Sequence, residues 1–216
     1  MALEACELGR VYGDIDKKAV LLKSTVTVVA QVGIENASTR LIGKEAGFQD
    51  AFIYRYFNDK DHLLSQAYIN ENEKLMNILV NAIDGENRFI DEKPLEERSA
   101  HVIQAAWKYL TENTDICKFL VYYYNSPGFR KYAMDNHKKW LDKLSDLLYP
   151  TFQDRDEAES LLYMIFNSVY GFAIQVANGE LPNTEETAER VFRNVYTAIY
   201  ACYERTHRQE EPAEQS

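Results

Sequence analysis

The sequence predicts an all-α fold, and three observations lead to that class. Nine glycines and five prolines are few for a chain of 216 residues. Long stretches repeat apolar residues every three or four positions, the spacing of helices that bury one face. The densest pattern, residues 38–64, indicates two short helices joined by a glycine turn and followed by the start of a third helix. A chain of this length can bury a substantial core in one or two domains.

The first helix is predicted over residues 16–32. Ala19, Leu22, Val26 and Val29 fall on one face at a spacing near that of the α-helix. The run of threonine and valine at 25–29 has poor helix propensity and would also suit a strand. The apolar spacing, and the support that the next helices need, favour a helix.

Two short helices are predicted next, at about 39–46 and 50–57, with the spacing of a helix-turn-helix. Gly43 is small enough to let the two helices approach closely, and Gly47 supplies the positive φ that ends the first one. Ile53, ten residues after Gly43, is expected to pack the second helix onto the first. Three consecutive short helices of an ordinary α-helical domain would show the same spacing.

The rest of the chain predicts six further helices, which brings the total to nine. Asn58 or Asp59 can cap the first of them, and Asp154 with Glu157 has capping-box spacing before a later one. Pro150 is expected to end the helix that precedes it. The expected ranges are 60–82, 94–113, 114–125, 126–149, 154–178 and 184–205, with a polar loop at 84–93 and a flexible polar tail at 209–216.

Residues 17–64 resemble the N-terminal domain of the tetracycline-repressor (TetR) family of bacterial regulators. The matching motifs are Gly33-Ile34, Ile42-Gly43-Lys44-Glu45-Ala46-Gly47-Phe48 and Ile53-Tyr54-Arg55-Tyr56-Phe57-Asn58-Asp59-Lys60-Asp61-His62-Leu63. The resemblance implies a three-helix helix-turn-helix domain at 1–60 that binds DNA, and a helical ligand-binding and dimerisation domain at 61–208. It also implies the function we expect: a repressor that binds a palindromic operator as a homodimer and is released by a small-molecule effector.

The resemblance places the DNA-facing side chains on and just before the second helix of the motif. In this sequence they are Ser38, Arg40, Gln49, Asp50, Ala51, Phe52, Tyr54 and Arg55, with Lys60 at the start of the next helix. Arg55 can bind guanine bidentately or pair with a phosphate. Tyr54 and Ser38 offer hydroxyl groups to phosphates, and Lys60 offers a charge. Each of these side chains would look the same in sequence if it were an ordinary solvated surface residue.

Residues 49–52, Gln-Asp-Ala-Phe, depart from the Ser-Lys-Gly-Thr that the family often has there. Asp50 replaces a basic residue, and it can cap a helix or accept a hydrogen bond from cytosine. Phe52 can contact a thymine methyl group or simply be exposed. We therefore expect modest nonspecific DNA binding. The alternative is a co-regulator of the same fold that has lost DNA binding and acts through a protein partner.

The resemblance also implies a small-molecule cavity among the later helices. The candidate ligand-binding residues are mostly aromatic: Trp107, Phe119, Tyr123, Trp140, Phe166, Asn167 and Tyr170. Any one of these aromatics can equally be plain core or a dimer contact. Asn167 is a polar group on an apolar helix, and a buried amide needs a partner that a ligand or water could supply.

Two apolar stripes on the last two helices predict a dimer interface. The first consists of Leu162, Ile165, Val169 and Phe172, and the second of Val191, Val195, Ala198 and Cys202. Two copies of this helix pair would form a four-helix interface. A monomer with a central helix is the alternative reading.

The charge is uneven along the chain. The net charge is −10, while residues 1–60 hold eight basic and eight acidic residues, so the excess lies in the remainder. A neutral DNA-binding end and an acidic body suit approach to DNA in one orientation and argue against a general nucleic-acid binder.

Catalysis, metal binding and membrane insertion find no support in the sequence. The four histidines lack metal-ligand spacing, and no phosphate loop or nucleophile motif occurs, so we expect no enzyme, cofactor or metal. Three distant cysteines and the absence of a signal-peptide pattern favour a reduced, cytoplasmic location, although one cysteine could sense oxidants. Residues 160–179 carry no charge, but their polar groups and acidic flanks suit a buried soluble helix better than a bilayer span.

Overall fold

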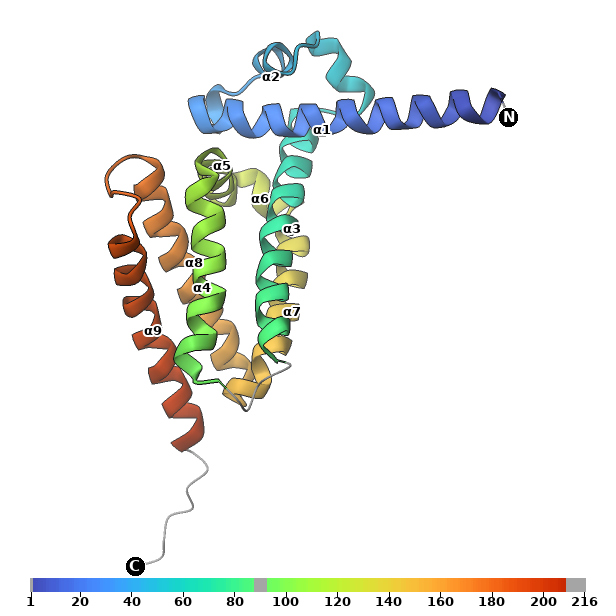
Figure 1. The fold of residues 1–216 in the computed structure, drawn as a ribbon. Helices are drawn as coiled ribbons and strands as arrows, with labels where there is room; N and C mark the ends of the chain where they lie inside the picture. The colour runs from blue at the N-terminus through green and yellow to red at the C-terminus, as the bar shows by residue number, and fades with distance from the viewer. Residues whose placement is uncertain (1, 88–92, 209–216) are drawn as a thin grey trace, which may run out of the picture. The chain divides into compact units, whose positions relative to one another are not determined.

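The structure is a computed structural model, and it describes residues 2–87 and 93–208. This part of the chain forms nine α-helices, one 3₁₀ helix and no strand, which confirms the all-α prediction (Figure 1). In chain order the elements are α1 (Ala2–Asn36), α2 (Thr39–Ala46), η1 (Asp50–Arg55), α3 (Lys60–Asn87), α4 (Leu95–Glu112), α5 (Thr114–Tyr124), α6 (Pro127–Tyr132), α7 (Met134–Phe152), α8 (Arg155–Ala177) and α9 (Glu185–Arg208).

The chain divides into two compact units. Unit 1 consists of Met1–Glu71 and Lys118–Met134, and unit 2 of Asn72–Cys117 and Asp135–Ser216. The segment Lys118–Met134, which is most of α5 together with α6, therefore belongs to the unit that contains the helix-turn-helix. The predicted domains, 1–60 and 61–208, stay a prediction about which parts fold and function alone.

Unit 1 is built on α1, which packs against α2, and α2 in turn contacts η1. Leu21, Val29, Ile42 and Ile53 are fully buried and form its core. An aromatic cluster fastens the α5–α6 segment to α3, because the Tyr68 ring lies 5.0 Å from Tyr123 and 5.4 Å from Phe129 between ring centroids.

Unit 2 is a helical bundle in which α4, α8 and α9 pack against one another. The α8 helix starts where the sequence predicts it, since the Asp154 carboxylate accepts hydrogen bonds from the backbone N–H groups of Asp156 and Glu157, each at 3.0 Å. The helix ends at Asn178, followed by Gly179 at φ 78°. This unit supplies the helices that surround the cavity described below.

Three predicted elements differ from the structure. Residues 50–57 were expected to be α-helical, but η1 is a six-residue 3₁₀ helix. The helix expected over 126–149 is two helices, interrupted at Ala133, whose φ of −122° is not helical. Pro150 does not stop α7: it lies in the last turn, and the helix continues to Phe152 before Gln153 takes a positive φ of 56°.

Helix boundaries also differ at both ends of unit 1. The first helix begins at Ala2 rather than near residue 16, and Gly33, at φ 77° and ψ 165°, interrupts it near its C-terminal end. The α3 helix extends to Asn87, beyond the expected end near residue 82. Part of the predicted loop 84–93 and all of the predicted tail 209–216 lie outside the described residues.

Candidate nucleic-acid interface and ligand cavity

The turn between α2 and η1 depends on its two glycines. Gly47 has φ 72° and donates its N–H to the carbonyl of Lys44 at 3.2 Å, which closes α2. A Cβ on Gly43 would lie 3.0 Å from the Phe48 carbonyl oxygen and 3.2 Å from the Asp50 backbone. Ile53 is fully buried beneath the turn. The roles predicted for Gly43, Gly47 and Ile53 are therefore confirmed by the packing.

Two of the predicted DNA-facing side chains are engaged within unit 1. The Ser38 hydroxyl caps α2 by accepting the Leu41 N–H at 3.2 Å. The Lys60 ammonium donates to the Ile34 carbonyl at 3.0 Å, and so ties the start of α3 to the chain just after the Gly33 break. Asp59 caps α3 by accepting the His62 N–H at 2.7 Å, as the sequence predicts for Asn58 or Asp59. These contacts fix the start of α2 and join the start of α3 to the C-terminal end of α1.

The remaining predicted DNA-facing side chains lie on one side of η1 or on α2. Tyr54 is 57% exposed, and Arg40, Gln49, Asp50, Ala51 and Arg55 are also exposed. Gln49, Ala51, Phe52 and Arg55 line one shallow depression beside the turn. The Asp50 carboxylate accepts the N–H of its neighbour Ala51 at 2.9 Å, but Asp50 lies inside η1 and Gln49 is the N-cap, so neither of the two roles that the sequence leaves open for Asp50 is established.

The Phe52 ring has two positively charged side chains over it. Its ring lies 4.8 Å from Phe48 and 5.4 Å from Tyr56 between centroids, in one aromatic row. The Arg55 guanidinium lies 5.1 Å from the Phe52 ring centroid, and the Lys17 ammonium lies 5.9 Å from it. Cation–π attraction at these distances favours one position of the Arg55 side chain. An exposed arginine held beside an amide and a phenol is suited to hydrogen bonding with base edges and phosphates.

A second candidate site is an apolar cavity inside unit 2, with a volume of about 100 Å³. Helices α3, α4, α7 and α8 supply most of its walls, and α9 adds Ile199. The walls are hydrocarbon side chains apart from Arg98, Ser99, Thr151 and Tyr170. Its composition, mostly apolar with a few polar groups, is that of a small-molecule site.

Few of the predicted ligand-binding residues line this cavity. Phe166 and Tyr170 do, whereas Trp107 and Trp140 do not, and Asn167 is exposed. Phe119 and Tyr123 are buried in unit 1 and belong to the aromatic cluster there. A ligand-binding role of those residues stays a prediction that this cavity does not support: aromatic residues in a sequence identify buried positions, but they do not distinguish a cavity wall from a solid core.

The sequence analysis missed Arg98 and Thr151, the polar pair of the cavity. The Arg98 Nη1 donates to the Thr151 Oγ1 at 3.4 Å. Arg98 lies in the first turn of α4 beside two glutamates, a place where an arginine is usually solvated. Nothing in the local sequence signals that its side chain turns inward.

The predicted dimer stripes are largely internal to unit 2. Val191, Val195 and Cys202 are at most 2% exposed. Leu162, Ile165 and Val169 line the cavity, while Phe172 and Ala198 are half-buried. The stripes thus mostly mark faces of α8 and α9 that pack inside the protomer, and their assignment to a partner contact stays a prediction that this burial does not support.

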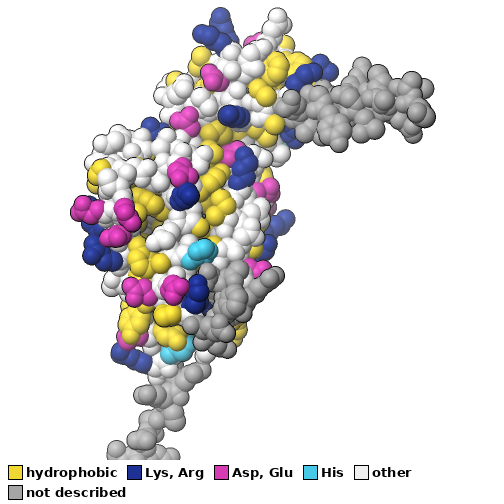
Figure 2. All heavy atoms as spheres, in the orientation of Figure 1, with side chains coloured by type: hydrophobic (Ala, Val, Ile, Leu, Met, Phe, Trp, Pro, Cys, Tyr) yellow, Lys and Arg dark blue, Asp and Glu magenta, His cyan; other side chains and the backbone are white. Residues whose placement is uncertain are grey.

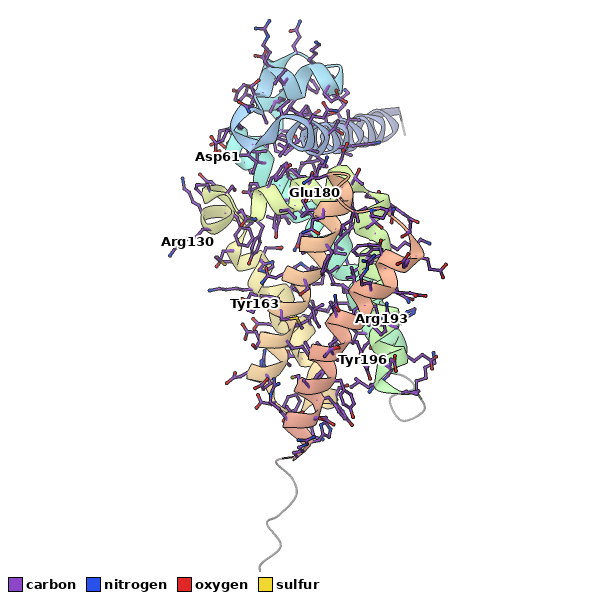
Figure 3. The ribbon with its side chains drawn as sticks, turned by 90° about the vertical axis from the view of Figure 1, so that its left-hand side faces the viewer. Asp61, Arg130, Tyr163, Glu180, Arg193 and Tyr196 are labelled. Carbon is purple, nitrogen blue, oxygen red and sulfur yellow. The ribbon has the colours of Figure 1, made fainter. Side chains whose placement is uncertain are left out.

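A different face of α8 and α9 remains uncovered. Figure 3 labels Tyr163 on α8 and Arg193 and Tyr196 on α9, on the side of the helix pair that is turned to the viewer. Phe192 stacks on Tyr196 at 5.6 Å, and Tyr196 lies 6.2 Å from Tyr200, which is 47% exposed. Figure 2 shows hydrophobic side chains at the surface of this unit between acidic and basic ones.

Metal-binding, thiol and membrane features of the described residues complete the description of possible sites. These residues contain no cluster of three His, Cys, Asp or Glu residues that could hold a metal ion. Burial raises the pKa of the Cys202 thiol to about 11, assisted by the Glu157 carboxylate 3.6 Å away, so this cysteine is held as an unreactive thiol. By length and composition α8 could cross a membrane, with a mean hydropathy of 1.4 over its most apolar stretch.

Known proteins share both the motif and the fold. Residues 21–67 match the family described as bacterial regulatory proteins, tetR family. The HTH-type transcriptional regulator BetI of Vibrio atlanticus is 25% identical over 159 residues, which cover 72% of this chain and 77% of BetI. A TetR family transcription regulator from Marinobacter aquaeolei superposes with a TM-score of 0.70 at 19% identity, over 87% of this chain and 97% of that one.

A solved structure with a bound molecule is also similar. FadR from Bacillus subtilis in complex with stearoyl-CoA has a TM-score of 0.64 at 20% identity, over 84% of this chain and 98% of FadR. The matching family and the relatives are transcriptional regulators and not enzymes. The match over residues 21–67 confirms the resemblance to the TetR family that the motifs at 17–64 predict, and the solved structures share the fold.

Proposed function

We propose that this protein is a cytoplasmic repressor that binds a palindromic operator as a homodimer and releases it when a small molecule occupies the cavity of unit 2. The observation that carries the proposal is the coexistence of an exposed recognition surface on η1 with an internal apolar cavity in the other unit. Regulation needs both: a surface that binds DNA and a site whose occupancy can differ between two states.

The helix-turn-helix supports DNA recognition. Arg55, Gln49 and Tyr54 offer donors and acceptors from one short element that follows a correctly formed turn. With balanced charge over residues 1–60, few phosphates can be neutralised, so the salt dependence of binding should be shallow. Specificity then depends on contacts to base edges.

The uncovered aromatic face of α8 and α9 supports dimerisation. Tyr163, Tyr196 and Tyr200 present apolar rings with polar ends, a composition that is enriched at protein interfaces. Two copies joined along this helix pair would carry two recognition elements. On B-DNA such elements meet successive major grooves at a spacing of about 34–36 Å.

The cavity supports control by a ligand. Its walls are apolar, and Arg98 and Thr151 provide polar groups that could orient a bound molecule. FadR, which shares this fold, is seen with stearoyl-CoA, which supports a ligand-binding role for the body of this chain also. The effector must bind the DNA-competent and DNA-incompetent states with different affinities, or it cannot release the operator.

The experiment is a fluorescence anisotropy titration of the purified protein against the DNA upstream of its own gene. We expect a specific complex at submicromolar protein that competitor DNA of unrelated sequence does not displace. A cell extract freed of protein, used as a source of small molecules, should reduce that binding. Absence of any specific complex, with co-purification of another regulator instead, would favour the co-regulator function.

A further inference from the structure

The cavity of unit 2 is long and narrow. Along α4 its walls run from Arg98 to Leu110, which at 1.5 Å per residue is about 18 Å. Its volume is about 100 Å³, well below the roughly 300–1,000 Å³ of sites for drug-sized ligands, so even a slender chain of ten carbons must displace lining side chains to enter. A slender, unbranched molecule suits this space better than a broad ring system.

The polar groups of the cavity gather at one end. Arg98 and Ser99 lie in the first turns of α4, and Thr151 lies in the last turn of α7, bonded to Arg98. Apart from Tyr170, all other lining side chains are alanine, valine, leucine, isoleucine or phenylalanine. A ligand that fills the cavity therefore meets a polar end and an apolar length.

Arg98 carries an unsatisfied donor at that end. Its Nε is buried and has no hydrogen-bond partner among the described residues, and Thr151 is a weak, neutral partner for Nη1. No aspartate or glutamate lines the cavity. A guanidinium cannot lose its charge, so an anion is the group that compensates it, and a carboxylate can accept two parallel N–H bonds.

We propose that the ligand of this cavity is an apolar chain with an anionic end, such as an aliphatic acid, whose carboxylate binds Arg98 beside Thr151 while its chain lies between α4, α7 and α8. The polar end distinguishes this ligand from a neutral hydrocarbon. Only the description of this ligand as an effector rests on the proposed function.

The test compares molecules of one length and different heads by isothermal titration calorimetry: decanoate, decanol and decylamine. We expect decanoate to bind at least about tenfold more tightly than decanol, because a charge-assisted hydrogen bond is lost in the alcohol, and decylamine to bind most weakly. Equal affinities for decanoate and decanol would overturn the proposal. In a series of acids, affinity should rise about fourfold per methylene until the cavity is full.

Variants of Arg98 test where the head group of the ligand binds. Arg98→Met should abolish the preference for decanoate over decanol while retaining decanol binding, and Arg98→Lys should keep part of it. Lys108→Met is the matched control, since Lys108 lies on the same helix with its side chain 74% exposed. A preference that survives Arg98→Met would overturn the role of Arg98. If that variant does not fold, the head-group comparison in the unmodified protein still decides.

The anionic end of the ligand could be a free carboxylate or the phosphates of a conjugate. Adding decanoyl-coenzyme A to the comparison separates these two sources. Tighter binding of the free acid assigns the ligand to carboxylates, and tighter binding of the thioester assigns it to conjugates whose phosphates supply the anion. Anisotropy with operator DNA separates this proposal from the proposed function. Decanoate that binds through Arg98 without releasing DNA would refute only its role as effector, whereas a protein that never binds DNA would refute the regulatory function.

Discussion

Phe52 and Arg55 together determine what the recognition surface offers to DNA. The Phe52 ring is fixed by Phe48 and Tyr56, and the Arg55 guanidinium lies over it. Without this platform the arginine would sample more rotamers and lose more entropy on binding. We therefore predict that Phe52 positions Arg55, a role beside the thymine contact and the plain surface residue that the sequence allows.

Arg55→Ala should weaken specific DNA binding about 10- to 100-fold, because one bidentate base contact is worth about 1–3 kcal/mol. Phe52→Leu should give a smaller loss in the same direction. Anisotropy titrations against specific and scrambled duplexes measure both. Arg190→Ala, on α9 in unit 2 with its side chain 57% exposed, is the control. Unchanged affinity and sequence preference in Arg55→Ala would remove this residue from the interface.

Tyr123 carries a second residue-scale prediction. Its hydroxyl is buried in unit 1 and lacks a hydrogen-bond partner among the described residues, and burial raises the pKa of this phenol far above its usual value. Tyr123→Phe removes the unsatisfied donor and should raise the free energy of unfolding by about 1 kcal/mol. Urea denaturation measures this, with the exposed Tyr149→Phe as the neutral control. A clear loss of stability would show that the hydroxyl has a partner.

Residue-scale predictions from sequence succeed where the cause is local. The roles of Gly43 and Gly47 follow from backbone geometry over a few residues, and both are confirmed. The contact of Lys60 with the Ile34 carbonyl joins positions 26 residues apart, and no local pattern indicates it. The inward turn of Arg98 is hidden for the same reason.

Among the elements, η1 shows that the spacing of apolar residues cannot identify the type of a very short helix. Six residues contain too few turns to distinguish the 3₁₀ helix from the α-helix by apolar spacing. Similarly, α6 and α7 form one continuous pattern in sequence, and their separation at Ala133 arises because α6 packs in unit 1 while α7 belongs mainly to unit 2. Tertiary packing decides these boundaries.

The α9 helix explains why the predicted dimer stripe differs from the uncovered face. An amphipathic helix shows its apolar face in sequence, but that face packs against its own chain first, as Val191, Val195 and Cys202 do. A second face of this helix consists of Phe192, Tyr196 and Tyr200. The sequence does not reveal it as an apolar face, because tyrosine is found both in cores and in contact with water. The interface is thus better sought among exposed aromatics than in the strongest apolar stripe.

This reasoning gives a prediction for the helix pair. Tyr200→Glu should convert the proposed dimer to monomers, because two unpaired charges would be buried at a symmetric contact. Sedimentation velocity over a range of concentrations measures the association. Tyr149→Glu, on α7 and 51% exposed against 47% for Tyr200, is the matched control. Dimerisation unaffected by Tyr200→Glu would place the interface elsewhere.

For the whole molecule, the stability of the fold should depend on pH through His137. Burial in unit 2 lowers the pKa of this imidazole below its usual value of 6.5. Below pH 6.5 the unfolded chain therefore binds more protons than the folded one, so stability falls as the pH decreases.

His137→Gln should flatten the slope of unfolding free energy between pH 7.5 and about 5.5, above the range where carboxylates dominate. Urea denaturation at several pH values measures this slope. Gln104→Asn, an exposed substitution on α4 that changes no titratable group, is the control and should leave the slope unchanged. A slope that persists in His137→Gln would assign the effect to other groups.

The whole molecule combines a helix-turn-helix that matches a family with a helical body that holds the apolar cavity. The sequence predicts the first closely, because that motif is short, local and shared. The cavity needs five helices to come together, so its residues could not be identified before the fold was known.

The most direct test of the regulator is selection of its binding site from a library of random DNA duplexes. The protein should enrich a palindrome whose half-sites lie one helical turn apart, about 10–10.5 base pairs between centres or a multiple of it. Arg55→Ala should change or lose the enriched bases within each half-site while keeping any residual spacing. Failure to enrich any sequence, or enrichment of a single unpaired half-site, would contradict a dimeric operator-binding regulator.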